Sequence, residues 1–208
     1  MKTLDRPALP ECTEKRLPRY LRVLKNLMDS GEYRVSSSRL ASLLDASPSQ
    51  IRQDLSCLGE FGLRGYGYDA GTLYTAILDL TGVREEYSAV IFGTPEMTAM
   101  LKLRPVFVGQ GVALRGCVDS TEKDAKKKFE SLCKKERPNI TVIASDEKYA
   151  DVICKIAEQN GVRGIWNLSG ARLRTSLPVK NLWIDDSLTT LCYRLGKEEK
   201  EKKNGKRK

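Results

Sequence analysis

The chain has 208 residues, of which 40% are hydrophobic and 30% charged, and this length suits two domains that each bury a core. No apolar run reaches the roughly 20 residues that a membrane-spanning helix needs, and the N-terminus lacks the apolar core of a signal peptide. These features argue against a membrane protein or membrane partner and predict a globular protein of the cytoplasm.

The net charge of +9 suits a polyanionic partner, but the excess does not lie in residues 1–82, where 11 basic and 10 acidic side chains nearly balance. An argument for DNA binding must therefore rest on where individual basic residues are placed. The six cysteines form no CxxC pair and histidine is absent, which argues against a zinc site and against the usual catalytic triads. We predict no bound metal and no catalytic residues.

Residues 17–58 show the apolar periodicity of three consecutive helices. The first is expected from about Leu17 to Ser30, where Gly31 ends it. Ser36 can cap the second helix, whose apolar positions are Leu40, Leu43 and Leu44. A short turn then leads to the third helix, so that the second and third together form a helix-turn-helix.

The third helix begins with clear start signals. Ser47 can be its N-cap, Pro48 takes the first position, and Gln50 can close a capping box. Its inward stripe is Ile51, Leu55 and Leu58. The side chains expected to point outward are Ser49, Gln50, Arg52, Gln53 and Ser56. Together with Ser47 they suit a recognition helix in a DNA major groove; the alternative is an ordinary three-helix core with a solvated polar face.

Three glycines after the third helix indicate a tight hairpin. Gly62, Gly65 and Gly67 surround Arg64 and Tyr66, which is the composition of the wing in a winged-helix domain. Arg64, Gly65 and Tyr66 at its tip are placed to enter a minor groove. A fourth helix is expected from a cap at residue 69 to a stop at residue 82. We therefore predict a winged-helix DNA-binding domain in residues 1–82.

After residue 82 short apolar runs alternate with helical segments, a pattern typical of parallel strands joined by crossover helices. The expected strands are 88–92, 112–118, 140–144, 164–168 and 179–184. The expected helices between them are 96–103, 122–136 and 147–160. Residues 83–184 are thus predicted to form an α/β domain.

A last helix is expected in residues 185–195, with an apolar face formed by Leu188, Leu191, Cys192 and Leu195. No later strand remains for this face to cover, so it can dock on a partner subunit, or alternatively on its own sheet. The basic segment 196–208 contains no apolar residue to bury and is predicted to be disordered.

A ligand of an open α/β sheet binds beyond the carboxyl end of the first strand, where glycines let a helix N-terminus approach a pyrophosphate. Of the GxGxxG pattern only Gly93 is present, because Pro95 and Thr98 stand at the other two glycine positions. Glu96 adds a negative charge where phosphate would lie. Asp119, at the end of the second strand, can still bond a ribose diol, although an acidic residue without the glycines is more often a simple helix cap.

The segment VSSSRLASLLDASPSQIRQDLSCLGEFGLRGYGYD, residues 35–69, strongly resembles the winged-helix domain of the Rex family of redox-sensing transcriptional repressors. The likeness extends to RLPRYLR at residues 16–22 and to GVRGIWN at residues 161–167. It implies a Rossmann-like domain of the CoA-binding type that senses the balance of NADH and NAD. It also implies a homodimer that binds a palindromic DNA operator and exchanges its C-terminal helix.

Carried over residue by residue, the resemblance assigns DNA contacts to Arg52 and Arg64 and places Arg22 near the interface of the two domains. Gln53 stands where the family usually has lysine, and an amide is better suited to adenine. In the second domain Arg104 and Trp183 replace a tyrosine and an acidic residue of the family. The chain is thus a divergent Rex-like sequence with a degenerate NAD(H)-binding loop.

The leading hypothesis is a dimeric repressor, with itself or a related regulator as partner, in which NADH sensing is weakened or lost. One alternative is a functional sensor that uses Thr94, Thr98 and Asp119 in place of glycines. Two others are a thiol switch through Cys57 or another cysteine and a small α/β oxidoreductase, which no constellation of proton-transfer groups supports.

Overall fold

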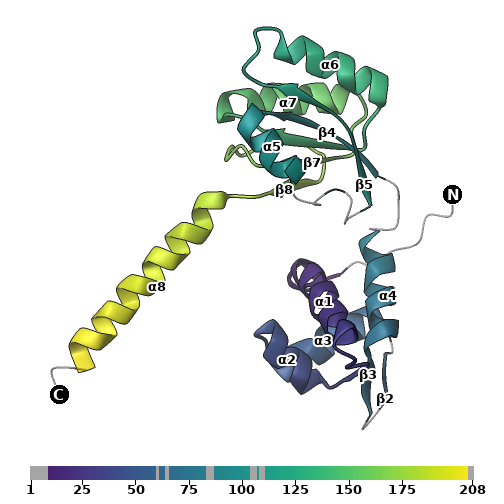
Figure 1. Cartoon of the computed structure of the whole chain (residues 1–208), viewed down its shortest axis with the longest axis vertical. Coiled ribbons are helices and arrows are strands. Elements are labelled where there is room, and N and C mark those ends of the chain that lie inside the picture. Colours follow the sequence, from purple (N-terminus) through teal and green to yellow (C-terminus); the bar gives the residue numbers. More distant parts are fainter. Residues whose placement is uncertain are drawn as a thin grey trace. The chain divides into compact units, whose positions relative to one another are not determined.

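The structure is a computed structural model, and it describes residues 9–59, 61–63, 66–82, 87–103, 107 and 111–205. The chain divides into two compact units, Met1–Glu85 and Glu86–Lys208 (Figure 1). Their boundary lies close to the one predicted after residue 82.

The N-terminal unit combines four helices with a small antiparallel sheet, as expected for a winged helix. Its elements in chain order are α1 (Glu11–Asp29), β1 (Arg34–Val35), α2 (Ser37–Leu44), α3 (Pro48–Leu58), β2 (Gly62–Leu63), β3 (Gly67–Asp69) and α4 (Ala70–Thr81). Their apolar faces meet in one core, which includes Leu17, Tyr20, Leu24, Leu40, Leu44, Ile51, Leu55, Leu73 and Ile77.

Helix α1 begins earlier than the predicted Leu17. It starts at Glu11 and continues through Pro18, which lies inside the helix and not at its start. Proline in a helix interior removes one hydrogen bond and crowds the preceding turn. The turns before Pro18 are nevertheless held in place, because Thr13 and Leu17 are both buried.

The predicted caps of the helix-turn-helix are confirmed. Ser36 accepts a hydrogen bond from the backbone N–H of Arg39, and Asp45 ends α2 in the left-handed conformation at φ 54°. Leu43 was expected in the core, but its side chain is 39% exposed. Leu40 and Leu44, one turn apart, already cover the buried side of this short helix, so Leu43 lies at its edge.

The predicted hairpin is present, and a third strand supports it. Strands β2 and β3 pair antiparallel, with Leu63 opposite Gly67, and β1 pairs with the other side of β3. Gly67 has φ +71°, and a Cβ there would lie 2.6 Å from the carbonyl oxygen of Val35, so only glycine fits. The two-residue strand β1 was not predicted. Arg64 and Gly65, predicted at the tip, lie outside the described residues.

The C-terminal unit is an α/β domain, as predicted. Its elements are β4 (Tyr87–Gly93), α5 (Pro95–Leu103), β5 (Val112–Asp119), α6 (Ala125–Glu136), β6 (Ile140–Ala144), α7 (Glu147–Gln159), β7 (Gly164–Asn167), β8 (Val179–Asn181) and α8 (Ile184–Gly205). The five strands pair in parallel in the order β5-β4-β6-β7-β8. The strand order therefore reverses at β4, where open α/β sheets bind ligands.

Alternate residues of β4 point to opposite faces of the sheet, and each face is covered by helices (Figure 1). Val90 and Phe92 pack into the core formed with α6 and α7, while Ala89 and Ile91 pack toward α5. Phe92 meets the ring of Phe129 edge-on, with ring centroids 5.4 Å apart. Burial on both faces explains the continuous apolar run of this strand.

Helix α8 differs from the prediction in length. It was expected to end at Leu195, with a disordered tail from residue 196, but it continues to Gly205. The segment after Leu195 is rich in lysine and glutamate, which favour a helix even without an apolar face to bury. Leu188, Leu191 and Leu195 are exposed, so the alternative in which this face docks on its own sheet is not supported.

None of the helices in the described part of the chain is both long and apolar enough to cross a membrane. The cytoplasmic location stays a prediction.

Candidate nucleic-acid interface

Helix α3 presents the polar face that the sequence predicts. Ser49, Arg52, Gln53 and Ser56 are exposed, and Ser47 caps the helix by accepting a hydrogen bond from the N–H of Gln50 at 3.1 Å. The apolar side chains of Ile51 and Leu55 are buried on the opposite side. Arg52 donates to Oγ of Ser37 at the start of α2, at 3.2 Å. The exposed face thus carries donors and acceptors that are available to a ligand.

Gln50 was predicted to belong to this outward face, but its side chain turns inward. Its Nε2 donates to Oδ1 of Asp54 at 3.2 Å and does not close the other half of the capping box with Ser47. The charge on the carboxylate makes this hydrogen bond stronger than one between neutral groups. Gln50 is half-buried and engaged within the protein, and its predicted contact with DNA stays a prediction.

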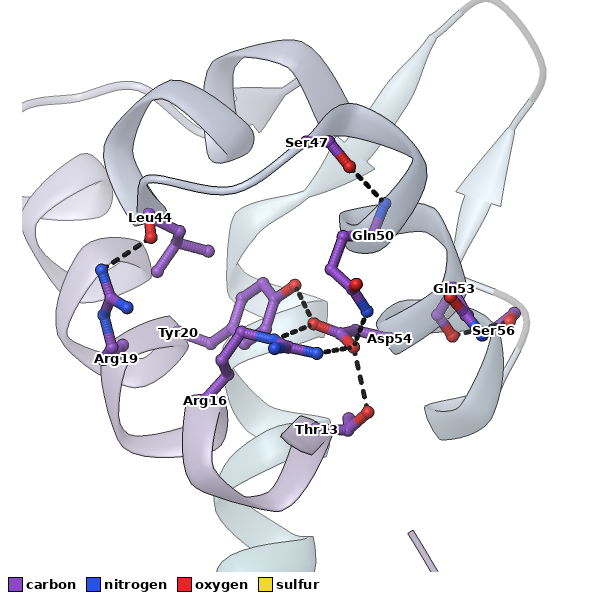
Figure 2. A network of polar contacts seen from close by, with 10 residues as sticks. All are labelled: Thr13, Arg16, Arg19, Tyr20, Leu44, Ser47, Gln50, Gln53, Asp54 and Ser56. Carbon is purple, nitrogen blue, oxygen red and sulfur yellow. Dashed lines mark hydrogen bonds and ion pairs between the residues drawn. The ribbon is translucent and has the colours of Figure 1, made fainter. Parts of the chain in front are cut away.

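Asp54 is the centre of a polar cluster that sequence reasoning missed (Figure 2). Its carboxylate is fully buried and accepts hydrogen bonds from α1 and α3. Oδ1 accepts from Thr13 Oγ1 at 2.9 Å, from Arg16 Nη2 at 2.6 Å and from Gln50. Oδ2 accepts from Arg16 Nε at 2.6 Å and from the Tyr20 hydroxyl at 3.0 Å. We call these five residues the Asp54 cluster.

The charge of Asp54 is stabilised although the residue is buried. Burial alone raises the pKa of its carboxyl group, but the hydrogen bonds from Arg16, Thr13, Tyr20 and Gln50 together outweigh it and leave the pKa below the ordinary value of 3.8. The hydrogen bond with Asp54 raises the pKa of Arg16, while burial and then the nearby carboxylate raise the pKa of Tyr20. The cluster is therefore a carboxylate paired with a guanidinium and a neutral phenol.

This pKa shift predicts how the N-terminal unit responds to acid. The pKa of Asp54 is lower in the folded than in the unfolded state. Its contribution to the free energy of unfolding is therefore fully present above pH 3.8 and is lost as the pH falls through the pKa of the folded state. Urea denaturation between pH 7 and pH 2.5 should show this loss. The loss should be smaller in Asp54→Asn, which has no carboxyl group to titrate, and an equal loss in both proteins would contradict the assignment.

The other predicted DNA contacts are placed as follows. Arg22 is exposed on α1, and Tyr66, between β2 and β3 of the hairpin, is 75% exposed. Arg64 and Gly65 lie outside the described residues.

A sequence signal for the Asp54 cluster did exist, because an acidic residue falls between Ile51 and Leu55 in the inward register of α3.

In the second unit, Gly93 and Asp119 lie opposite each other at the carboxyl ends of β4 and β5. They line a pocket of about 420 Å³ together with Thr98, which was also a candidate, and with side chains that were not candidates: Pro95, Lys102, Cys117 and Glu122. Thr94 does not line this pocket; its hydroxyl accepts a hydrogen bond from the N–H of Met97 at the start of α5.

The protein family described as "Putative DNA-binding protein N-terminus" matches residues 8–56. The redox-sensing transcriptional repressor Rex 1 of Thermotoga maritima is 33% identical over 199 residues, which cover 90% of this chain and 96% of the relative. Rex of Clostridium novyi is 34% identical over 194 residues, with 87% and 92% covered. This chain belongs to the Rex family.

Solved Rex structures agree with that assignment. RSP, a Rex-family repressor, superimposes with a TM-score of 0.83 at 27% identity, and the likeness covers 94% of this chain. RSP has been crystallised with β-NAD+ and operator DNA, and separately with β-NADH. The predicted combination of a winged helix with a Rossmann-like parallel sheet is confirmed.

Gly93 and Thr98 lie close together where β4 leads into α5. A Cβ at Gly93 would lie 2.9 Å from the carbonyl oxygen of Ala144 and 3.3 Å from Oγ1 of Thr98, so the Thr98 side chain lies against Gly93. Pro95 has no N–H to offer a phosphate at the start of α5. The loop of this Rex-family chain thus packs tightly upon itself.

One carboxylate oxygen of Asp119, the candidate ribose ligand, already accepts two hydrogen bonds. Its Oδ1 accepts from the N–H of Thr121 at 2.8 Å and from the Thr121 hydroxyl at 2.7 Å. These hydrogen bonds lower the pKa of Asp119. The carboxylate therefore stabilises the turn that follows β5, which is the simple capping role that such a residue often has.

Proposed function

We propose that this chain is a Rex-type transcriptional repressor that binds a DNA operator, with α3 in the major groove. The observation that carries the proposal is the exposed polar face of α3, formed by Ser49, Arg52, Gln53 and Ser56 on a helix whose other side is buried. A neighbour of the same fold, RSP, has been solved with operator DNA, which supports this use of the face.

Within this proposal the residues have different roles. Ser47 and Ser49 at the helix N-terminus suit phosphate contacts, whereas Arg52 and Gln53 suit the edges of guanine and adenine. The tip of the hairpin, with Arg64, Gly65 and Tyr66, would enter the adjacent minor groove. Arg22 on α1 would lie at the margin of the interface.

Replacing Arg52 with alanine should weaken operator binding by about 1 to 3 kcal/mol, roughly 5- to 150-fold, because one bidentate base contact is lost. The operator is first selected from randomised duplex DNA with the whole chain, and affinity is then measured by fluorescence anisotropy. Arg172→Ala, an exposed arginine of the other unit, is the matched control and should bind as the unchanged protein does. Unchanged affinity in Arg52→Ala would contradict the proposed role of this residue.

We propose that the repressor acts as a dimer and reads a palindromic operator. The exposed leucines of α8, at positions 188, 191 and 195, form an apolar face on a helix of 22 residues. A partner subunit, either a second copy or a related regulator, would bury this face. Two half-sites one helical turn apart would then match the symmetry of the pair.

We further propose that NADH sensing is weakened or lost in this member of the family. The support comes from the loop after β4, where Thr98 packs against Gly93 and Pro95 removes a backbone donor. Glu96, exposed in the first turn of α5, repels a phosphate at that position. Operator binding by such a protein would not depend on the ratio of NADH to NAD.

Calorimetry with micromolar NADH or NAD should therefore show no binding heat. The double variant Pro95→Gly, Thr98→Ala should bind NADH more tightly, because it restores a backbone N–H and removes the hydroxyl and methyl groups beside Gly93. Micromolar binding by the unchanged chain would instead favour the alternative sensor that uses Thr94, Thr98 and Asp119.

The two other functions considered, a thiol switch and a small α/β oxidoreductase, have less support. Burial raises the pKa of the Cys133 thiol to about 11 and also raises that of Cys154, which keeps both in the unreactive thiol form. Cys57 is half-buried at the end of α3, and a thiol switch there would require peroxide to change operator affinity. The relatives are transcriptional repressors, which speaks against an oxidoreductase.

A further inference from the structure

Helix α1 holds both helices of the helix-turn-helix by directed polar contacts. Arg19 Nη2 donates to the carbonyl oxygen of Leu44, the last residue of α2, at 2.6 Å. The Asp54 cluster connects α1 with α3 through Thr13, Arg16 and Tyr20, which lie on one face of α1 (Figure 2). The two helices on either side of the turn are thus tied to the same support.

The Asp54 cluster lies behind the exposed polar face of α3. Asp54 is fully buried, whereas Arg52 and Gln53 are exposed, and Figure 2 shows Gln53 and Ser56 on the side of the helix away from the cluster. Because both sides belong to one rigid helix, its rotation about its own axis sets the direction of the exposed side chains.

The cluster is better suited than the apolar core to define this rotation. Five hydrogen bonds converge on the Asp54 carboxylate, which offers about four lone-pair positions, so its capacity is filled. Hydrogen bonds weaken steeply when their angles change, whereas the burial of Ile51 and Leu55 has no preferred direction. A small rotation of α3 would misalign several hydrogen bonds at once.

We propose that Asp54 is a positioning residue for DNA recognition and that Thr13, Arg16 and Tyr20 set, through it, the rotation at which α3 meets the major groove. The inference rests on the proposed function and adds to it. It also gives Gln50 a place within the cluster instead of at the DNA.

The experiment compares two mild variants of the whole chain. Tyr20→Phe removes the hydroxyl that donates to Asp54 and keeps the buried ring, while Ile77→Val trims a buried side chain of α4 outside the cluster. For each variant, affinity is measured for the selected operator and for a shuffled duplex of equal length, at a temperature where both variants are folded. Amide NMR spectra of α3 are recorded without DNA.

We expect operator affinity in Tyr20→Phe to fall by about tenfold, the effect of a mismatched base pair, with shuffled-duplex affinity unchanged and the α3 resonances shifted. Ile77→Val should keep the ratio of the two affinities. The inference is overturned if Tyr20→Phe keeps this ratio and the α3 spectrum, or if Ile77→Val loses the ratio to the same extent. If the unchanged chain itself shows no preference for the operator, the proposed function fails, and this inference fails with it.

Discussion

Asp54→Ala should lower the free energy of unfolding of the N-terminal unit by about 3 to 5 kcal/mol, because it leaves the partner of a buried ion pair without its counter-charge. Arg16 keeps a 20% exposed side chain and regains some hydration, but the hydroxyls of Thr13 and Tyr20 remain buried without their acceptor. Urea denaturation followed by circular dichroism measures this change.

The two tryptophans allow the units to be followed separately. Trp166 and Trp183 both belong to the C-terminal unit, so their fluorescence reports that unit, whereas circular dichroism reports both. In Asp54→Ala the fluorescence transition should occur at the same urea concentration as in the unchanged protein. Asp29→Ala, an exposed carboxylate at the end of α1, is the matched control and should change stability by about 0.5 kcal/mol or less. A loss below about 1 kcal/mol in Asp54→Ala would mean that the cluster is dispensable.

Phe92→Ala should lower the free energy of unfolding of the C-terminal unit by a comparable amount. Phe92 is fully buried in the central strand β4 and packs edge-on against Phe129 and Tyr149, with ring centroids 5.4 and 5.8 Å apart. Removing its ring leaves a cavity and should cost about 3 to 5 kcal/mol. The tryptophan fluorescence transition should therefore move to lower urea concentration.

Protein concentration is kept constant in this comparison, because subunit association would shift the apparent stability. Val152→Ala, at a 38% exposed position of α7, serves as the control and should leave the transition nearly unchanged. If Phe92→Ala moved the circular-dichroism signal of both units together, the two units would not unfold independently.

The sequence predicted the architecture well, because local signals and global fold agree along most of the chain. Caps at Ser36, Ser47 and Asp69 and the stop at Gly82 fall where serine, aspartate and glycine satisfy helix ends. The alternation of apolar runs and helical segments likewise predicted the parallel sheet. These features depend on residues that are close together in the sequence.

The error at Gln50 arose because most members of the Asp54 cluster are distant from it in the sequence. Asp54 meets Thr13 and Arg16 across about 40 positions, so no local pattern predicted that Gln50 would turn inward to join them. The sequence likewise could not predict that Thr121 donates two hydrogen bonds to Oδ1 of Asp119, because that depends on the conformation of a turn.

The close approach of β1 to β3 has a consequence for redesign of operator specificity. The carbonyl of Val35 leaves no room for a side chain at Gly67, so the base of the hairpin is fixed in sequence as well as in shape. Tyr66, by contrast, is exposed. A library that keeps Gly67 and varies Tyr66, Arg52 and Gln53 could therefore retarget the protein to new DNA sites while its scaffold stays intact.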